Sequence, residues 1–512
     1  MRKMPIGIQD FEKLRTDDYV YVDKTELVYQ LARFSTPFFL GRPRRFGKSL
    51  LLSTLRAYFE GKKELFRGLA IERLEKDWTP YPVLHIDLNV TNYTDMASLE
   101  AGLSENLSAW GEDKEESAAG TLATRFYRLI RKTYEKSGQK VVVLVDEYDR
   151  PLLQTMENGN AHDDMRQALK GFYGVLKSAD RWLRFVLLTG VTKFSKVSVF
   201  SDLNMLRDIS LEDAYAGICG ISAEELERYF GQELEALAEK QNMTCEEAAA
   251  EMKKRYDGYH FCEDSEGMFN PFSVLNTLSK RKFAHYWFET GTPTYLIEQM
   301  KRDRFDLLRF AEGVEIPVRS IDDYRVDGGN PVPLLYQSGY LTIAGCANGR
   351  YRLDFPNEEV RYGFLEELLP YYAYRPVGQD FFADDFADDL RTGDVDGFMG
   401  RLKTFFAHIP YDLNDQTERH YQVVFYLVFT LMGQYVQAEV RSAKGRSDAV
   451  VVTRDTVYVF EFKLHGTAEE ALAQIEAKGY AIPYEAGQRE VVKVGVAFDQ
   501  AERNISRWLQ RR

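Results

Sequence analysis

The sequence predicts an α/β protein that begins with a parallel β-sheet covered by helices. Over residues 1–200, strand-like and helix-like segments alternate along the chain. The run at residues 141–145 is continuously apolar and mostly β-branched, as in a central strand buried on both faces. The tripeptide Gly47, Lys48 and Ser49 stands between a strand-like and a helix-like segment. Strands that alternate with helices in this way favour a parallel sheet with helices on its faces.

Each element of this first region follows from its local pattern. The expected strands are short apolar runs, and the expected helices are the longer segments between them. In chain order we predict a strand at 37–40, a helix at 48–59, a strand at 83–88, a helical stretch at 97–136, a strand at 141–145, a helix at 163–177 and a strand at 185–189. Together they define a first domain over residues 1–204.

The composition and the expected secondary structure change twice in the middle of the chain. Residues 205–290 are acidic and rich in helix-like segments. Residues 291–374 mix short helices with a hairpin. We expect the hairpin to turn at Asn348 and Gly349, because an Asn-Gly pair favours the two-residue turns that join antiparallel strands. Two separate regions are therefore expected between the first domain and the C-terminal part of the chain.

A boundary near residue 375 separates the last α/β domain, over residues 375–512. After a helix that runs to about residue 433, we expect strands in a hairpin, then a helix at 468–478 and a strand at 491–497. Neither an internal repeat nor a low-complexity tract interrupts this pattern.

Composition narrows the classes of protein that the chain can belong to. The net charge of −13 over 512 residues argues against a protein that coats nucleic acid by bulk charge, although a local basic groove stays open. No run approaches the roughly 18 apolar residues that span a bilayer, and no apolar signal core follows Met1. The four cysteines show no zinc spacing. We expect a cytoplasmic protein without a membrane partner.

Residues 42–49 have the chemistry of a loop that binds nucleotide phosphates. In such a P-loop, backbone N–H groups wrap the phosphates, and the N-terminus of the following helix adds a favourable dipole. Gly47, Lys48 and Ser49 match the end of the pattern. Lys48 is expected to reach the β- and γ-phosphates of ATP, and Ser49 is expected to hold Mg²⁺.

The start of the loop departs from the strict pattern. Arg42 occupies the first glycine position, Gly41 stands one residue early, and Pro43 removes one N–H donor. The arginines of the loop add positive charge that can offset this loss. We expect the whole loop to take part in nucleotide binding, through Arg42, Arg44, Arg45, Phe46, Gly47, Lys48 and Ser49.

The expected strand at 141–145 is followed directly by two acidic residues, Asp146 and Glu147. This is the Walker-B arrangement, in which Asp146 is expected to position Mg²⁺ and Glu147 to polarise the attacking water. The alternative is a solvated strand end without a catalytic role. Thr189, at the tip of the next expected strand, is a candidate sensor of the γ-phosphate, and a plain strand-end threonine is the alternative.

Several longer segments resemble a known family. They are Tyr21-Val22-Asp23-Lys24-Thr25, the Arg-Pro-Arg-Arg-Phe-Gly-Lys-Ser loop, Asp146-Glu147-Tyr148-Asp149, Asn270-Pro271-Phe272-Ser273 and Ser338-Gly339-Tyr340-Leu341. With them the chain resembles the bacterial AAA-ATPase-like family over almost its whole length. In that family the arginine-rich loop recurs, so the missing first glycine is a family trait.

This resemblance implies an order of domains. It implies a P-loop NTPase core at 1–204, a helical lid region at 205–290, a winged-helix-like region at 291–374, and a restriction-endonuclease-like domain of the PD-(D/E)XK type at 375–512, preceded by a helical linker.

A second set of candidate residues lies in the last domain. Asp448 precedes one expected strand, and Glu461 and Lys463 stand two apart on the next, so these two share a face. Two carboxylates on adjacent strands can hold a divalent cation, which lowers the pKa of a bound water and stabilises the phosphorane charge. We expect Asp448 and Glu461 to bind Mg²⁺ or Mn²⁺, and Lys463 to orient the water or neutralise the transition state.

This second motif is similar to the PD-(D/E)XK nuclease core. Gln474 and Tyr480 match the helix that follows in that family. Many such folds also use an acidic residue on an early helix, for which Glu418 and Glu439 compete, and the sequence alone does not separate the two. A nuclease-like fold that serves only binding or packing is the alternative.

The leading hypothesis is an ATP-binding, ATP-hydrolysing protein whose C-terminal domain cleaves nucleic acid, with DNA favoured over RNA. The alternative is a nucleotide-dependent switch or assembly protein whose C-terminal module is catalytically silent and only binds a partner. Self-association into a homo-oligomer stays open.

Overall fold

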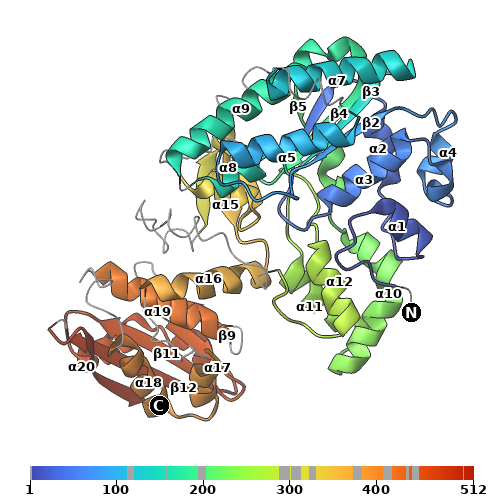
Figure 1. Ribbon diagram of the computed structural model, residues 1–512. Helices are drawn as coiled ribbons and strands as arrows, with labels where there is room; N and C mark the ends of the chain where they lie inside the picture. Colours follow the sequence, from blue (N-terminus) through green and yellow to red (C-terminus); the bar gives the residue numbers. More distant parts are fainter. Residues whose placement is uncertain are drawn as a thin grey trace. The chain divides into compact units, whose positions relative to one another are not determined.

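The computed structural model describes residues 3–111, 120–156, 158–193, 203, 205–287, 300, 313–321, 330–372, 383–407, 418–433, 437–440, 449–499 and 501–512. The chain divides into two compact units (Figure 1). One comprises Met1–Phe305 and Gly313–Val360, and the other comprises Asp306–Glu312 and Arg361–Arg512. The division into four domains made above stays a prediction.

The first unit is built on a five-stranded sheet in the order β2-β3-β4-β1-β5. Every pairing in it is parallel, as the alternating sequence pattern predicts. The strands are β1 (Pro37–Gly41), β2 (Val83–Asp87), β3 (Val141–Asp146), β4 (Leu183–Gly190) and β5 (Arg207–Asp208). β3 is buried along its whole length, in agreement with its apolar sequence. Because all strands run the same way, their carboxyl ends meet at one edge of the sheet.

Helices flank this sheet or pack against the helices that do (Figure 1). They are α1 (Phe11–Thr16), α2 (Thr25–Ala32), α3 (Lys48–Phe59), α4 (Ile71–Leu74), α5 (Met96–Ala109), α7 (Leu122–Ser137), α8 (Arg150–Gln154) and α9 (Gly159–Ser178). α7 packs against α5 and α9, and the rings of Phe126 and Phe172 stack between α7 and α9 with their centroids 4.6 Å apart. α3 packs against β2 and β3.

The single helical stretch expected at 97–136 is wrong. In the residues of this range that the structure describes, it has two helices, α5 and α7. Gly111, just past the end of α5, has φ +87°, a backbone conformation that continues no helix and that glycine adopts readily. Thr121 then starts α7 by accepting the N–H of Thr124 with its side chain, which is a typical N-cap.

The helix-rich part of the first unit forms its own hydrophobic cluster. Its helices are α10 (Ala223–Gln241), α11 (Cys245–Tyr256) and α12 (Pro271–Lys280). Both α10 and α11 start with a capping box, Ser222 with Glu225 and Thr244 with Glu247, as their sequences favour. Their apolar faces pack around Phe230 and Met252 together with Val20 from the N-terminal segment. The start of the chain and this helical region therefore share one core.

The predicted hairpin is present in the first unit. Its strands are β7 (Thr342–Ala347) and β8 (Arg350–Asp354), and β6 (Val314–Pro317) adds a third antiparallel strand beside β8. Asn348 and Gly349 have φ of +53° and +71°, as the expected turn requires. A short helix, α15 (Val332–Gln337), precedes the hairpin. The winged-helix-like description of this region stays a prediction.

A buried carboxylate ties the next helix, α16 (Glu358–Tyr372), to the helical region. Glu359 is buried and accepts hydrogen bonds from the Ser273 hydroxyl at 2.7 Å and from the Trp287 N–H at 2.8 Å. Burial raises the pKa of Glu359 to about 7, although these donors oppose the shift. The folded state therefore binds this proton more tightly than the unfolded chain does.

This pKa predicts a pH-dependent stability. The contribution of Glu359 is fully present below its ordinary pKa near 4.5 and is lost as the pH rises through about 7. Between pH 5 and 8 the wild type should lose up to about 3 kcal/mol of unfolding free energy through this group. Glu359→Gln, permanently neutral, should remove that part of the slope in urea unfolding. Glu246→Gln, an exposed glutamate on α11, is the control. Equal slopes in wild type and Glu359→Gln would contradict the prediction.

The second unit contains a mixed five-stranded sheet in the order β13-β12-β11-β10-β9. β11 and β12 are parallel, and the other pairs are antiparallel. The strands are β9 (Gln437–Val440), β10 (Ala449–Val452), β11 (Thr456–Lys463), β12 (Glu490–Asp499) and β13 (Asn504–Arg511). The hairpin of β10 and β11 and the strand β12 were predicted, whereas β9 and β13 were not.

After α16, the described helices of the second unit are α17 (Ala383–Arg391), α18 (Val395–Ala407), α19 (Glu418–Met432), α20 (Ala468–Lys478) and α21 (Ile482–Glu485). Phe398 of α18, Phe429 of α19 and Phe460 of β11 contact one another in an aromatic core. α20 packs so closely on β12 that a Cβ at Gly495 would lie 2.4 Å from the carbonyl oxygen of Ala468. This glycine is therefore required for α20 to reach the sheet.

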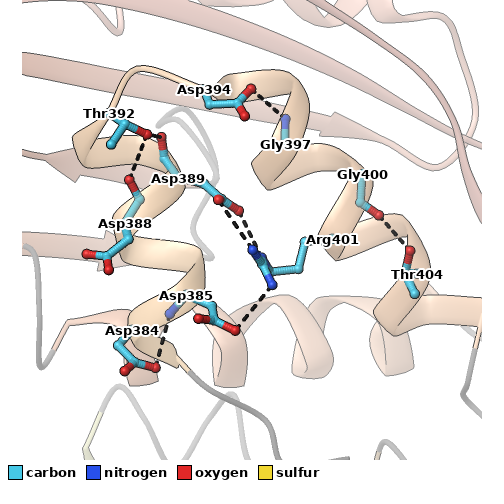
Figure 2. Close-up of polar contacts among 10 residues, drawn as sticks. All are labelled: Asp384, Asp385, Asp388, Asp389, Thr392, Asp394, Gly397, Gly400, Arg401 and Thr404. Atoms are coloured by element: carbon cyan, nitrogen blue, oxygen red, sulfur yellow. Dashed lines mark hydrogen bonds and ion pairs between the residues drawn. The ribbon is translucent and has the colours of Figure 1, made fainter.

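Helix α17 carries four aspartates, Asp384, Asp385, Asp388 and Asp389, which form an acidic surface (Figure 2). Arg401 of α18 is directed at two of its carboxylates, with Nε 2.8 Å from Asp389 and Nη1 3.2 Å from Asp385. Asp394 caps the start of α18 by accepting the N–H of Gly397 at 2.8 Å. Arg391, in the last turn of α17, also pairs with Asp388, with 2.8 Å between Nη1 and Oδ1. Among the described helices of both units, none has the length and apolar character needed to cross a membrane.

Candidate nucleotide site and nuclease-like site

The loop between β1 and α3 has the backbone geometry of an anion-binding turn. Gly47 is the N-cap of α3 with φ +94°, a conformation that favours glycine. Glycine offers no side chain to cap the first N–H groups of α3, so these donors can serve an anion. Arg45 also has positive φ, at +67°, which makes the loop sharply curved.

Lys48 lies beneath this loop and faces the tip of β3. Its side chain is only 3% exposed, and its Nζ lies 3.1 Å from the carbonyl oxygen of Arg42 and 3.3 Å from that of Pro43. Its ionic partner is Glu147, with 3.1 Å between Nζ and Oε1. The structure thus brings together two predicted site residues that are about one hundred positions apart in the sequence.

Asp146 ends β3 with a buried carboxylate. Its Oδ1 accepts a hydrogen bond from the Thr189 hydroxyl at 2.9 Å, and the Ser49 hydroxyl is a further partner. Burial, and then the nearby charge of Glu147, raises the pKa of Asp146. A carboxylate with hydroxyl oxygens beside it is a donor set that fits a hard cation such as Mg²⁺.

Glu147 and Thr189 complete this edge of the sheet. Glu147 has φ +51°, so the chain turns sharply straight after β3. Its side chain is partly exposed, at 18%, while it reaches Lys48. Thr189 is near the end of β4, which lies between β1 and β3 in the sheet. The predicted sensor position is therefore next to both the loop strand and the acidic strand.

The arginines of the loop lie in different surroundings. Arg42 is 1% exposed, and its guanidinium donates to the carbonyl oxygens of Gly41, Ser210 and Tyr215 at 2.8 to 3.0 Å. Burial lowers its pKa. Its guanidinium therefore supports the backbone around the loop, and its part in nucleotide binding stays a prediction.

The other two arginines differ from Arg42. Arg44 is exposed. The guanidinium of Arg45 lies over the Phe272 ring, 3.6 Å from its centroid, at the start of α12.

Phe46 is packed into the helical region instead of facing outward. Its ring contacts those of Tyr259 and Phe261 with centroid distances of 4.7 and 5.4 Å, and its carbonyl accepts the N–H of Gly220 at 3.2 Å. Phe46 therefore anchors the loop, and its predicted role as a nucleotide contact stays untested.

An apolar cavity of about 100 Å³ opens beside Gly47. One wall is the N-terminal segment, with Val20 and Val22, and α3 contributes Leu51. The opposite wall is the helical region, with Ile221 and Leu275. Its apolar lining and its position next to the loop suit a flat ring system.

In the second unit, Glu461 and Lys463 share one face of β11, as predicted. Gln474 of α20 joins them: its amide nitrogen donates to Glu461 Oε1, and its amide oxygen accepts from Lys463 Nζ. Lys463 Nζ also lies 3.8 Å from Glu461 Oε1, and the Glu461 side chain is almost wholly buried. Tyr480 packs against the apolar cluster under α20.

The other predicted residues of this second site are acidic. Asp448 lies outside the described residues, as do the side chains of Glu418 and Glu439. β10 begins at Ala449, which pairs with Phe460, the neighbour of Glu461. Within the described part of the chain, no group of three or more metal-binding side chains comes together. One carboxylate beside a lysine and an amide fits half of a divalent-metal site.

Sequence reasoning overlooked one charged residue of the nucleotide site, Asp149. It is fully buried three residues after Asp146. Burial, and then the charge of Glu147, raises its pKa to about 6. The signal that could have found it was the acidic composition of the Asp146-Glu147-Tyr148-Asp149 segment, in which a third carboxylate follows the first two after one residue.

Fold and site together define the class of protein. A parallel sheet with a Gly-Lys-Ser loop after β1 and an Asp-Glu pair after β3 is a P-loop type of nucleotide-binding domain. A family model described as "Predicted AAA-ATPase" matches residues 5–200, and a PD-(D/E)XK nuclease superfamily model matches residues 416–508.

The chain belongs to the AAA-ATPase-like family with a C-terminal PD-(D/E)XK nuclease superfamily domain. It is 37% identical over 523 residues to a protein of Azotobacter chroococcum mcd 1 described as "Uncharacterized protein in vnfD 5'region", with 98% of each chain covered. The solved structure of the Aeropyrum pernix ORC2 protein in ADPNP–ADP complexes is also similar. That likeness covers 65% of this chain and 88% of that one, at 10% identity and a TM-score of 0.24.

Proposed function

We propose that this protein binds and hydrolyses ATP in its first unit and cleaves DNA with Mg²⁺ or Mn²⁺ in its second unit. The observation that carries the proposal is the convergence at the edge of the parallel sheet. There Lys48 meets Glu147 at 3.1 Å, while Asp146 holds the Thr189 hydroxyl at 2.9 Å. A cation, two carboxylates and a hydroxyl at a P-loop are the groups that phosphoryl transfer needs.

Different residues bind the base, the phosphates and the metal ion of the nucleotide. The apolar cavity beside Gly47 takes the base, and the N–H groups at the start of α3 take the phosphates. Ser49 and Asp146 hold Mg²⁺, which when bound neutralises charge on the β- and γ-phosphate oxygens. The buried carboxylate of Asp146 suits this role, because a cation offsets the burial that raises its pKa.

The ion pair between Lys48 and Glu147 separates during this reaction, and each side chain takes a new partner. Their ion pair satisfies both charges, and a triphosphate competes with Glu147 for the lysine. Once Lys48 turns to the phosphate, the Glu147 carboxylate is available to orient a water and accept its proton. Thr189, bonded to Asp146, is placed to register the γ-phosphate.

In the second unit, Asp448 and Glu461 hold the divalent cation. Such a cation supplies an activated water and stabilises the charge on the phosphate being attacked. Lys463 neutralises charge in the transition state, and Gln474 holds both Glu461 and Lys463 in place.

A plasmid-nicking assay tests the whole proposal. Supercoiled DNA is incubated with the full chain, with Mg²⁺ or Mn²⁺ and with or without ATP, and phosphate release is followed in parallel. We expect nicking that needs the metal, disappears with EDTA and changes with ATP. Nucleotide turnover without nicking under any condition would favour the alternative, a nucleotide-driven switch whose nuclease-like module only binds a partner.

A further inference from the structure

Asp149 begins α8, but its side chain does not cap that helix. It stands at the N-cap position, where an aspartate usually accepts N–H groups of its own helix, and it makes no such bond. Its Oδ2 instead accepts three hydrogen bonds from the segment after β4. The donors are the Val191 N–H at 3.1 Å, the Thr192 N–H at 2.6 Å and the Thr192 hydroxyl at 2.6 Å. Asp149 therefore joins the acidic turn to another strand.

The same segment is held from both sides. The neighbour of Asp149, Tyr148, donates its N–H to the Thr189 carbonyl at 2.9 Å and its hydroxyl to the Thr192 carbonyl at 2.9 Å. On the other side, the N–H of Arg42, the first residue of the phosphate loop, bonds to the Gly190 carbonyl at 3.2 Å. The end of β4 thus lies clamped between the acidic turn and the loop.

The residues at this clamp are closely packed. A Cβ at Gly190 would lie 2.6 Å from Asp149 Oδ1 and 2.7 Å from a ring carbon of Tyr148, so only glycine fits there. Asp149 is 0% exposed, and its Oδ1 has no hydrogen-bond partner among the described residues. A buried carboxylate with one unsatisfied oxygen is costly for stability, and proteins keep such costs mainly at functional sites.

We propose that Asp149 is a positioning residue for the proposed ATP hydrolysis, on which this inference rests. By fixing Val191 and Thr192, it holds the Thr189 hydroxyl against Asp146 and keeps the Glu147 turn in line with Lys48. Because Asp149 is fully buried, we expect it to act through these neighbours and not by contact with the nucleotide. Its loss should therefore affect turnover far more than nucleotide affinity, because a misplacement near 1 Å can lower a rate by about 10²-fold.

The test compares Asp149→Asn with Asp164→Asn, an exposed aspartate on α9, in the full chain. We expect Asp149→Asn to lower kcat for ATP hydrolysis by about 10- to 100-fold. The Kd for a fluorescent ATP analogue should stay within about threefold of wild type. Asp164→Asn should match wild type in both. Wild-type turnover in a folded Asp149→Asn variant, or an equal loss of affinity and turnover, would overturn the inference.

A second pair of variants covers the case in which Asp149→Asn does not fold. Thr192→Val removes one donor to Asp149 at nearly constant shape, and Thr192→Ser keeps that donor. Thr192→Val should lower kcat by about tenfold or less, and Thr192→Ser should restore turnover. Equal turnover in these two variants would argue against the clamp.

Hydrogen exchange separates this inference from the proposed function. Peptides that cover residues 189–193 should exchange faster in Asp149→Asn than in wild type, whether or not ATP is hydrolysed. If the wild type binds ATP without turnover, the proposed ATPase fails, and unchanged exchange in the variant would then overturn the clamp as well. Faster exchange in that case would support the clamp as a structural lock on the nucleotide site.

Discussion

Lys48→Ala should abolish ATP turnover, with a loss of about 10²- to 10³-fold or more. The Nζ of Lys48 is the buried cation beneath the phosphate loop, and it lies 3.1 Å from Glu147. Its removal withdraws the charge that stabilises the transferred phosphoryl group, and it leaves the Glu147 carboxylate without its ionic partner. Phosphate release by the purified full chain, at saturating ATP and Mg²⁺, measures the effect.

The matched control for this experiment is Lys63→Ala. Lys63 is an exposed lysine in the same unit, on the short helix η1 (Lys63–Phe66), so its removal should leave turnover unchanged. Thermal unfolding of both variants establishes that the fold is intact. Unchanged turnover in a clean preparation of Lys48→Ala would remove the assignment of residues 42–49 as the phosphate loop.

The second large effect is expected in the second unit. Lys463→Ala and Asp448→Asn should each reduce plasmid nicking by about 10²- to 10³-fold or more. Lys463 is one of the two groups that Gln474 joins, so its loss removes both a charge near the attacked phosphate and a partner of that amide. Loss of Asp448 removes a proposed metal ligand. Gel electrophoresis of nicked plasmid at fixed Mn²⁺ measures both effects.

Two conservative controls accompany these variants. Lys478→Ala removes an exposed lysine from the last turn of α20, and Asp388→Asn neutralises an exposed aspartate of α17. Neither should change nicking. ATP turnover should persist in all four variants, because their substitutions lie in the other unit. Nicking that survives in both Lys463→Ala and Asp448→Asn would identify the activity as a contaminant.

Much of the fold could be predicted because the signals are local. The apolar run of β3, the hairpin turn at Asn348 and Gly349, and the limits of α3 and α20 follow from residues within each element. Elements that depend on pairing were missed. β9 and β13 are strands at the two edges of their sheet. Their sequences show only a weak strand pattern, because an edge strand is stabilised largely by the strand it pairs with.

The candidate sites show the same division. The sequence indicated Lys48, Asp146 and Glu147 because motifs with a known mechanism surround them. It left the role of Arg42 open, because a loop arginine that donates to three backbone carbonyls has the same local sequence as one that binds phosphate. It did not show what Asp149 contacts, because the hydrogen-bond partners of that residue lie more than forty positions away.

By itself, the sequence determined that this chain carries a Gly-Lys-Ser motif between a strand and a helix, an acidic strand end and a carboxylate–lysine pair two positions apart. Only the tertiary structure decided that β4 inserts between β1 and β3, that Glu147 is the partner of Lys48, and that Gln474 bridges Glu461 and Lys463. The physical reason is range: backbone pattern and motif chemistry act within a few residues, whereas charge pairing and burial depend on which distant segments meet.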